Sequence, residues 1–157
     1  MPRYIIALII VLQPFCCLAQ DESIPSMTFN QLTEYLEKKE NKTVVVNFWA
    51  TWCRPCIAEL PYFEEARAAY RNQGVEVVLV SMDFSVDKAA SYASRKGLQS
   101  EVIFLDETNH NSWIPKIAPE WSGALPATLV LNNGSSSFHE GEINKNELEQ
   151  LIESNLN

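Results

Sequence analysis

Apolar residues in the first third of the chain follow two different periods. Between Met27 and Lys39 they recur at helical spacing, which predicts an amphipathic helix that starts near Thr28 or Asn30. The next apolar segment, Thr43–Phe48, is continuous and rich in β-branched residues. Such a segment is typical of a strand covered on both faces, and hence of a parallel sheet.

The alternation of helical and strand patterns continues to the end of the chain. The predicted elements are a helix over Ala58–Tyr70 that begins near Pro55, a strand over Val75–Val80, a helix over Asp87–Lys96, a strand over Val102–Leu105, a short helix over Asn109–Ile117, strands over Ala127–Leu131 and Ser136–Glu140, and a helix over Glu147–Ile152. The dipeptide Asn133-Gly134 separates the last two strands and is a strong signal for an antiparallel hairpin. This order predicts an α/β fold, a three-layer α/β/α sandwich with a mixed central sheet.

The first nineteen residues have the pattern of a secretory signal peptide. Arg3 supplies a positive charge, Tyr4–Leu12 is apolar, and Ala19 is the small residue that precedes a cleavage site. The apolar segment is shorter than the roughly 20 residues of a membrane-spanning helix, so an uncleaved anchor is the less favoured alternative. A lipid-modified Cys16 is a further alternative. We therefore expect a signal peptide over 1–19, one domain over 20–157, and an exported, periplasmic protein.

The charge of the chain argues against anionic partners. The 157 residues include 46% hydrophobic and 20% charged residues, which is typical of a folded soluble protein. Without residues 1–19 the chain keeps 11 basic and 20 acidic side chains, a net charge of −9. Binding to nucleic acid or anionic lipid is disfavoured by this charge, so we expect no nucleic-acid partner.

Cys53 and Cys56 are the cysteines that remain once residues 1–19 are removed. Two residues separate them at the predicted start of a helix, where unpaired N–H groups stabilise a thiolate on the first sulfur. This pattern predicts Cys53 as the nucleophile and Cys56 as the more buried resolving thiol. Alternatives are a static disulfide or half of a zinc site, but zinc needs two more ligands, and His110 and His139 lack ligand spacing. We expect no metal and no cofactor besides the redox-active disulfide.

The residues around the two cysteines resemble a known active site. The stretch from Val44 to Cys56, VVVNFWATWCRPC, resembles the strand-to-helix active site of the thioredoxin superfamily. Asn47 and the sequence CIAELP that begins at Cys56 resemble its exported TlpA/ResA-like branch. Cytoplasmic thioredoxins usually carry a buried aspartate at the position of Asn47, and the resemblance implies that the acidic partner has moved to Glu59. The alternative for Glu59 is a glutamate that faces solvent.

A second segment, Ala124–Thr128, resembles the cis-proline loop that faces the cysteine pair in this superfamily. The resemblance implies a cis bond before Pro126, and a Leu125 backbone that pairs with an extended substrate segment. The 45 residues between Val80 and Pro126 suit the strand-helix insertion of the TlpA/ResA-like branch. Peroxiredoxins share the core, but their lone peroxidatic cysteine in a Pro- and Thr-containing context is absent from this sequence.

The resemblance implies a thiol–disulfide oxidoreductase that acts on exported proteins in the reductive direction. The expected catalytic residues are Cys53, Cys56 and Glu59, and the expected substrate-binding residues are Trp52, Arg54, Pro55, Leu125 and Pro126. Its partners would be protein thiols and disulfides, apocytochromes among them, and a membrane electron-donor protein. The alternative is a non-catalytic thioredoxin-fold binding or scaffold protein with a structural disulfide.

Overall fold

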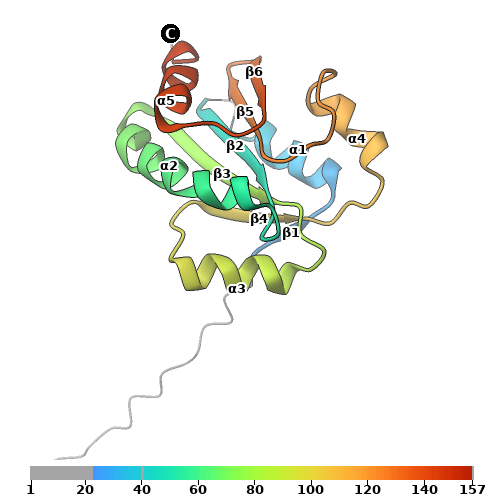
Figure 1. Cartoon of the computed structure of the whole chain (residues 1–157). Helices are drawn as coiled ribbons and strands as arrows, with labels where there is room; N and C mark the ends of the chain where they lie inside the picture. The colour runs from blue at the N-terminus through green and yellow to red at the C-terminus, as the bar shows by residue number, and fades with distance from the viewer. Residues whose placement is uncertain (1–22, 40, 157) are drawn as a thin grey trace, which may run out of the picture.

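A six-stranded mixed sheet lies at the centre of the protein (Figure 1). The computed structural model describes residues 23–39 and 41–156, so the predicted signal peptide over 1–19 lies outside the described residues. The elements are β1 (Ser26–Met27), α1 (Phe29–Glu37), β2 (Thr43–Trp49), α2 (Arg54–Tyr70), a 3₁₀ turn (Arg71–Gln73), β3 (Val75–Ser81), α3 (Val86–Lys96), β4 (Glu101–Leu105), α4 (His110–Ile117), β5 (Ala127–Asn132), β6 (Ser135–Glu140) and α5 (Lys145–Ser154). Within the described ranges no helix has the length and apolar character needed to span a membrane.

The strands follow the order β1-β4-β3-β2-β5-β6. Strands β1 to β4 pair in parallel, whereas β5 pairs antiparallel with both β2 and β6. Strand β2 pairs with β3 along its whole length, from Thr43 opposite Val75 to Trp49 opposite Ser81. Every residue of β2 is buried, because strands cover both of its edges and helices cover both of its faces.

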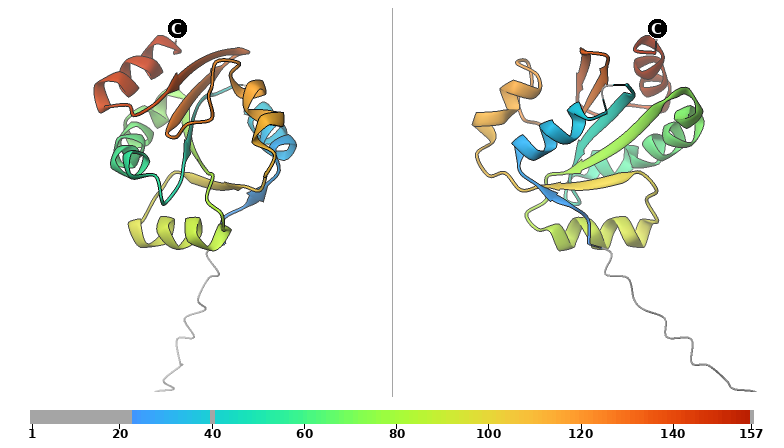
Figure 2. Two further views of the ribbon diagram at one scale, coloured as in Figure 1. Left: turned by 45° about the vertical axis from the view of Figure 1, so that its right-hand side comes forward. Right: turned by 180° about the vertical axis from the view of Figure 1, so that it is seen from behind.

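Helices cover the two faces of the sheet and make the three predicted layers (Figure 2). Helices α2 and α5 lie on one face with α3, and α1 and α4 lie on the other. Successive side chains of β2 serve the two cores alternately: Val45 and Trp49 pack in the first, and Val46 and Phe48 in the second. The predicted sandwich is therefore confirmed.

The elements between β3 and β5 confirm the predicted insertion. Helix α3, strand β4 and helix α4 occupy this stretch, and β4 enters the sheet between β3 and β1. Trp113 of α4 is buried and packs its ring near Phe29, Phe48 and Trp121. The insertion thus completes the core on the face covered by α1.

The first strand and helix of the described residues differ from the prediction. Met27 was expected in the first helix but belongs to β1, where it pairs with Leu105 of β4. The helix begins at Phe29, because the Thr28 side chain accepts a hydrogen bond from the Gln31 backbone and forms a capping box. The predicted hairpin is confirmed, with positive φ angles at Asn133 (47°) and Gly134 (81°).

Candidate active site

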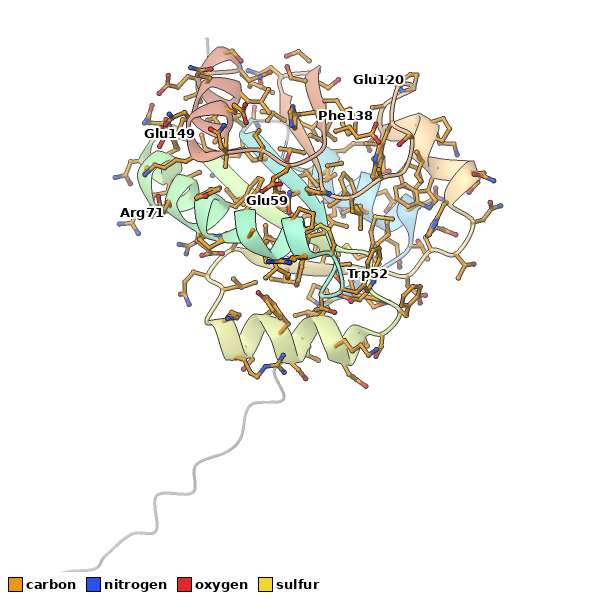
Figure 3. The ribbon with its side chains drawn as sticks, in the orientation of Figure 1. Trp52, Glu59, Arg71, Glu120, Phe138 and Glu149 are labelled. Carbon is orange, nitrogen blue, oxygen red and sulfur yellow. A yellow bond between two sulfur atoms is a disulfide. The ribbon has the colours of Figure 1, made fainter. Side chains whose placement is uncertain are left out.

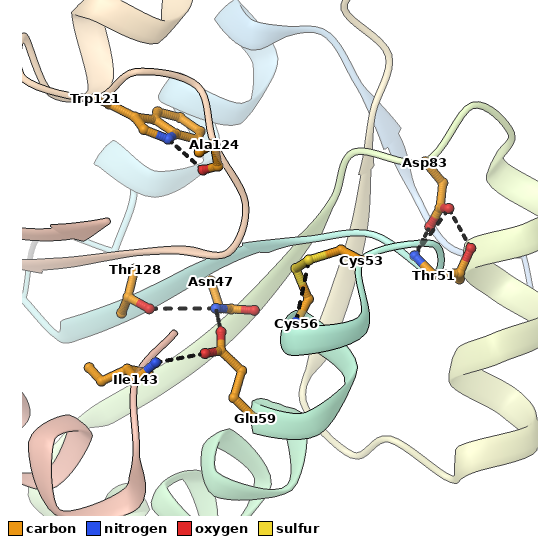
Figure 4. Close-up of a disulfide and its surroundings, with 10 residues drawn as sticks. All are labelled: Asn47, Thr51, Cys53, Cys56, Glu59, Asp83, Trp121, Ala124, Thr128 and Ile143. Carbon is orange, nitrogen blue, oxygen red and sulfur yellow. Dashed lines mark hydrogen bonds between the residues drawn. A yellow bond between two sulfur atoms is a disulfide. The ribbon is translucent and has the colours of Figure 1, made fainter. Parts of the chain in front are cut away.

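The two cysteines lie where β2 ends and α2 begins (Figure 4). Cys53 is the N-cap of α2, and Pro55 occupies the first turn, where a missing N–H costs nothing. A disulfide joins Cys53 to Cys56, with their α-carbons 5.3 Å apart. The Cys53 sulfur also accepts a hydrogen bond from the Cys56 backbone N–H at 3.3 Å. A negative charge on this sulfur would therefore be stabilised by the start of the helix.

The two sulfur-bearing residues differ in exposure. Cys53 is 6% exposed, whereas Cys56 is fully buried among the residues that pack between the sheet and α2. A large reaction partner can therefore approach Cys53 more readily than Cys56. This order agrees with the roles expected from the sequence, an attacking Cys53 and a resolving Cys56.

Glu59 lies inside the protein, one helical turn after Cys56 (Figure 3). Its exposed fraction is 0%, so the alternative of a solvent-facing glutamate is wrong. The Asn47 amide donates to Oε1 at 2.8 Å, and the Ile143 backbone N–H donates to Oε2 at 3.0 Å. The carboxylate is thus held between β2 and the segment that leads into α5.

Burial raises the pKa of Glu59 to about 7, because removal from water disfavours the charged form. The hydrogen bonds from Ile143 and Asn47 oppose this rise, and the negative charge of Glu142 adds to it. A carboxyl group with a pKa near neutrality can both accept and release a proton at physiological pH. The raised pKa of Glu59 lies in the range where a carboxyl group exchanges protons near neutral pH.

Asn47 connects Glu59 to the strand beside it. Its amide nitrogen donates to Glu59 and, at 3.5 Å, to the Thr128 hydroxyl of β5. Its amide oxygen is buried without a hydrogen-bond partner among the described residues, and Figure 4 shows it directed toward the side of Cys56. The sequence resemblance indicated that Asn47 stands at the position of a buried aspartate and that Glu59 supplies the acidic group instead. The structure shows the Asn47 and Glu59 side chains in direct contact.

The loop before β5 contains Leu125 and Pro126. The Leu125–Pro126 peptide bond is cis, as the sequence resemblance implies. Leu125 is half-buried and packs against the core that contains both cysteines. The loop is held by a bond from the Trp121 indole to the Ala124 carbonyl at 2.9 Å and by one from the Gly141 N–H to the Pro126 carbonyl at 2.9 Å.

The remaining predicted substrate-binding residues surround Cys53 in the chain. Trp52 and Arg54 are exposed and Pro55 is half-buried, so all three contribute to the surface next to the Cys53 sulfur. Sequence reasoning missed Phe84, whose ring stacks on Trp52. A signal existed, since Phe84 follows the predicted strand Val75–Val80 closely, as Trp52 follows its own strand.

The histidines take no part in this site. His110 packs edge-on against the Trp113 ring, and His139 lies 3.3 Å from the Glu142 carbonyl. Across residues 23–39 and 41–156, no group of three or more His, Cys, Asp or Glu side chains is arranged to hold a metal ion. A cavity of about 690 Å³ lies elsewhere, between α1 and the β5–β6 hairpin, and neither cysteine lines it.

Comparisons with known proteins agree with this geometry. The profile of the AhpC/TSA family matches residues 19–135. The chain is 52% identical over 54 residues to the thiol-disulfide oxidoreductase ResA of Oceanobacillus iheyensis, covering 34% of this chain and 28% of that one. It is 31% identical over 127 residues to ResA of Geobacillus thermodenitrificans, covering 80% of this chain and 67% of the relative.

Two solved structures have the same fold. One, assigned as the thiol:disulfide interchange protein DsbE of Chlorobium tepidum, is 25% identical and has a TM-score of 0.64, with 78% of this chain and 85% of that chain covered. The other is a secreted thiol-disulfide isomerase of Corynebacterium glutamicum, 20% identical with a TM-score of 0.66, with 77% and 74% covered. The second likeness concerns the fold alone.

Proposed function

Since the chain belongs to the AhpC/TSA family and is a thiol–disulfide oxidoreductase, we propose that it reduces disulfides of exported proteins through Cys53 and Cys56. One observation carries the proposal. The Cys53–Cys56 disulfide lies at the N-terminus of α2 with the Cys53 sulfur on the outer side and already bonded to a backbone N–H. That arrangement favours a thiolate at the position that a substrate can reach.

In the first step, the Cys53 thiolate attacks one sulfur of a substrate disulfide. The substrate S–S bond breaks, a mixed disulfide forms, and the second substrate sulfur leaves as a thiolate that takes up a proton. In the next step, Cys56 attacks the Cys53 sulfur and releases the remaining substrate thiolate. Two electrons have then passed from the two cysteines to the substrate, and the Cys53–Cys56 disulfide is restored.

Glu59 is the proton acceptor that we assign to the second step. Cys56 must lose its proton before it can attack, and Glu59 lies one turn away on the same helix. The carboxyl pKa of about 7 lets the group take up this proton near neutrality. When Glu59 is ionised, its negative charge also opposes thiolate formation. Glu59 would therefore raise the pKa values of the Cys53 and Cys56 thiols in the reduced protein.

The reductive direction requires electrons from another protein. We propose a membrane electron-donor protein that reduces the Cys53–Cys56 disulfide by the same exchange run in reverse, and substrates that include apocytochromes. No dissociable cofactor is needed, because the reduced dithiol of Cys53 and Cys56 carries the two electrons and becomes the disulfide when it gives them up. Export is supported by the signal-like pattern of residues 1–19.

Reduction of insulin by dithiothreitol tests the proposed activity. The chain from residue 20 onward is expected to accelerate precipitation of the insulin B chain, and Cys53→Ser is expected to abolish the acceleration. If the parent gives no stimulation and its disulfide has a potential below about −300 mV, a structural disulfide in a scaffold protein is the better interpretation. If the parent is active, covalent complexes captured with Cys56→Ser would identify its natural partners.

The role of Glu59 has a separate test in Glu59→Gln. We expect lower apparent thiol pKa values, measured by alkylation against pH, together with slower resolution of a mixed disulfide in stopped-flow experiments. The first effect follows from the loss of a negative charge, and the second from the loss of a proton acceptor. A variant that titrates and resolves like the parent would remove Glu59 from the mechanism.

A further inference from the structure

Two large apolar side chains remain exposed on the described surface, and they lie against each other. Trp52 is 56% exposed and Phe84 is 85% exposed, and no other large hydrophobic residue of the described ranges is comparably exposed. Their ring centroids are 5.9 Å apart and the ring planes meet at 20°, so the rings form one stacked surface. We refer to Trp52 and Phe84 together as the aromatic plate. Exposed apolar surface of this kind often marks a binding site.

The sheet register brings these two residues together. Trp49 pairs with Ser81 at the carboxyl ends of the parallel strands β2 and β3. Trp52 and Phe84 each follow that pair by three residues, so they occupy equivalent places in neighbouring loops. The carboxyl ends of neighbouring parallel strands are where α/β folds bind their ligands.

A buried carboxylate fixes the two loops to each other (Figure 4). Asp83 accepts hydrogen bonds from the Thr51 backbone N–H at 3.2 and 3.1 Å and from the Thr51 hydroxyl at 2.6 Å. The Ser81 hydroxyl donates to the same carboxylate at 2.9 Å. Thr51, which precedes Trp52, is therefore bonded to Asp83, which precedes Phe84. These bonds organise the aromatic plate before a partner binds.

We propose that the aromatic plate binds an aromatic or large aliphatic side chain next to the target cysteine of a protein substrate. The inference rests on the proposed function, in which the substrate sulfur must reach Cys53. Cys53 directly follows Trp52, so their α-carbons are about 3.8 Å apart. An extended segment advances about 3.3 Å per residue, which brings a side chain one or two positions from the target cysteine over the rings.

The surroundings of Cys53 favour a protein segment as the occupant. Half-buried Leu125 packs against the core that holds both cysteines, so its loop adds apolar surface to this part of the protein. The plate itself carries no charge. Phe84 makes this surface larger than Trp52 alone could, and it acts as a specificity-determining residue without touching the reacting sulfurs.

Matched peptides test the inference. Two short peptides carry one cysteine in a mixed disulfide with a thionitrobenzoate reporter and differ by Phe or Ser in the position next to that cysteine. We expect the reduced parent to release the reporter from the Phe peptide with a second-order rate constant about three- to tenfold higher than from the Ser peptide, the range given by an aromatic contact. Phe84→Ser should bring this ratio closer to one, and a general change in the activity of the variant does not affect a ratio of two peptides. Reduction of bis(2-hydroxyethyl) disulfide, a small disulfide without an aromatic ring, measures the redox activity of the parent itself.

Ser85→Ala provides the control in the same loop, because the Ser85 side chain makes no cap hydrogen bond. This variant should keep the preference of the parent. Equal rates of the parent with both peptides, or an unchanged preference in Phe84→Ser, would overturn the inference. So would a self-association of the parent in sedimentation that Phe84→Ser abolishes without any peptide preference, since a second copy would then be the occupant.

Failure of the proposed function has a different signature. A parent with no activity toward the small disulfide would refute the redox role itself, whereas a parent active on the small disulfide but indifferent to the peptide side chain would refute only the docking role of the aromatic plate.

Discussion

Replacement of Glu59 by Gln should remove a large pH dependence of folding stability. Glu59 has a pKa of about 7 in the folded protein, against 4.5 for an unperturbed glutamate. Below pH 4.5 the group is protonated in both the folded and the unfolded chain and has no effect on the pH slope. Between 4.5 and 7 the unfolded chain releases the proton while the folded protein keeps it, so stability falls as pH rises.

The size of the effect follows from the two pKa values. The rise from 4.5 to about 7 corresponds to about 3 kcal/mol of unfolding free energy, lost progressively over that interval and constant above it. Glu59 is fully buried, so solvent screening does not reduce this value much. The glutamine side chain of Glu59→Gln cannot ionise, and the difference in stability between the variant and the parent should grow in favour of the variant by this amount from pH 4.5 to pH 8.

The change itself is tolerable because the neighbours of Glu59 can adjust. The Asn47 amide donates to Glu59 and has an oxygen without a partner among the described residues, so a turn of this amide would let it accept from the new Gln side chain. We expect a pH-independent offset of about 1 kcal/mol for the altered hydrogen bonds. This offset does not affect the slope.

Guanidinium unfolding of the oxidised protein, followed by tryptophan fluorescence from pH 4.5 to 8.5, measures the difference. The intact disulfide keeps the cysteines from titrating. Glu37→Gln serves as the control, because Glu37 is exposed at the end of α1 and the same chemical replacement is made there outside the core. Other groups act in the opposite direction, such as Glu76, whose pKa is lowered by hydrogen bonds from Lys39 and Lys42. A difference between Glu59→Gln and the parent that stays constant with pH would refute the reasoning.

Three further predictions concern reactivity and stability. In the reduced protein, limiting iodoacetamide should label Cys53 before Cys56, as mass mapping would show, because Cys53 is more exposed and lies at the helix N-terminus; preferential label on Cys56 would contradict the assigned roles. Asn144→Ala should cost about 1 kcal/mol in denaturant unfolding through loss of the capping box of α5, and an unchanged midpoint would contradict this. Gly123→Ala should lower the melting temperature, because φ is +89° there and the added Cβ would lie 3.0 Å from Ile114 Cδ1; a parent-like melting curve would show that the loop adapts.

Much of the fold could be predicted because its signals are local. The continuous β-branched segment Thr43–Phe48 became β2, and Asn133-Gly134 became the hairpin turn. Strand β1 could not be predicted in the same way. It has two residues, and its pairing with Phe104 and Leu105 depends on a strand far along the chain. The tertiary partner, and not the local pattern, makes Ser26–Met27 a strand.

The functional site also contains both residues that local motifs predict and contacts that depend on the fold. Cys53, Cys56 and the Leu125–Pro126 loop could be identified from short motifs, and the motif around Cys56 also indicated Glu59. The donor from Ile143 could not be identified, because the fold alone brings its segment to Glu59. Phe84 had only a positional signal, since it follows a strand as Trp52 does, and its contact with Trp52 depends on the pairing of β2 with β3. An exposed aromatic residue has no periodic signal, and a backbone N–H has no sequence signal at all.

The hydrogen bond from Ile143 to Glu59 has a consequence for the order in which the protein is made. These two residues are 84 positions apart, and Ile143 directly precedes the cap of α5. A growing chain has both cysteines available for oxidation long before this donor has been synthesised. Glu59 acquires its full set of partners only when the C-terminal helix can dock. A chain that stops after the β5–β6 hairpin would keep the cysteine motif but lack the donor for one carboxylate oxygen, so the redox centre is complete only after synthesis has passed Ile143.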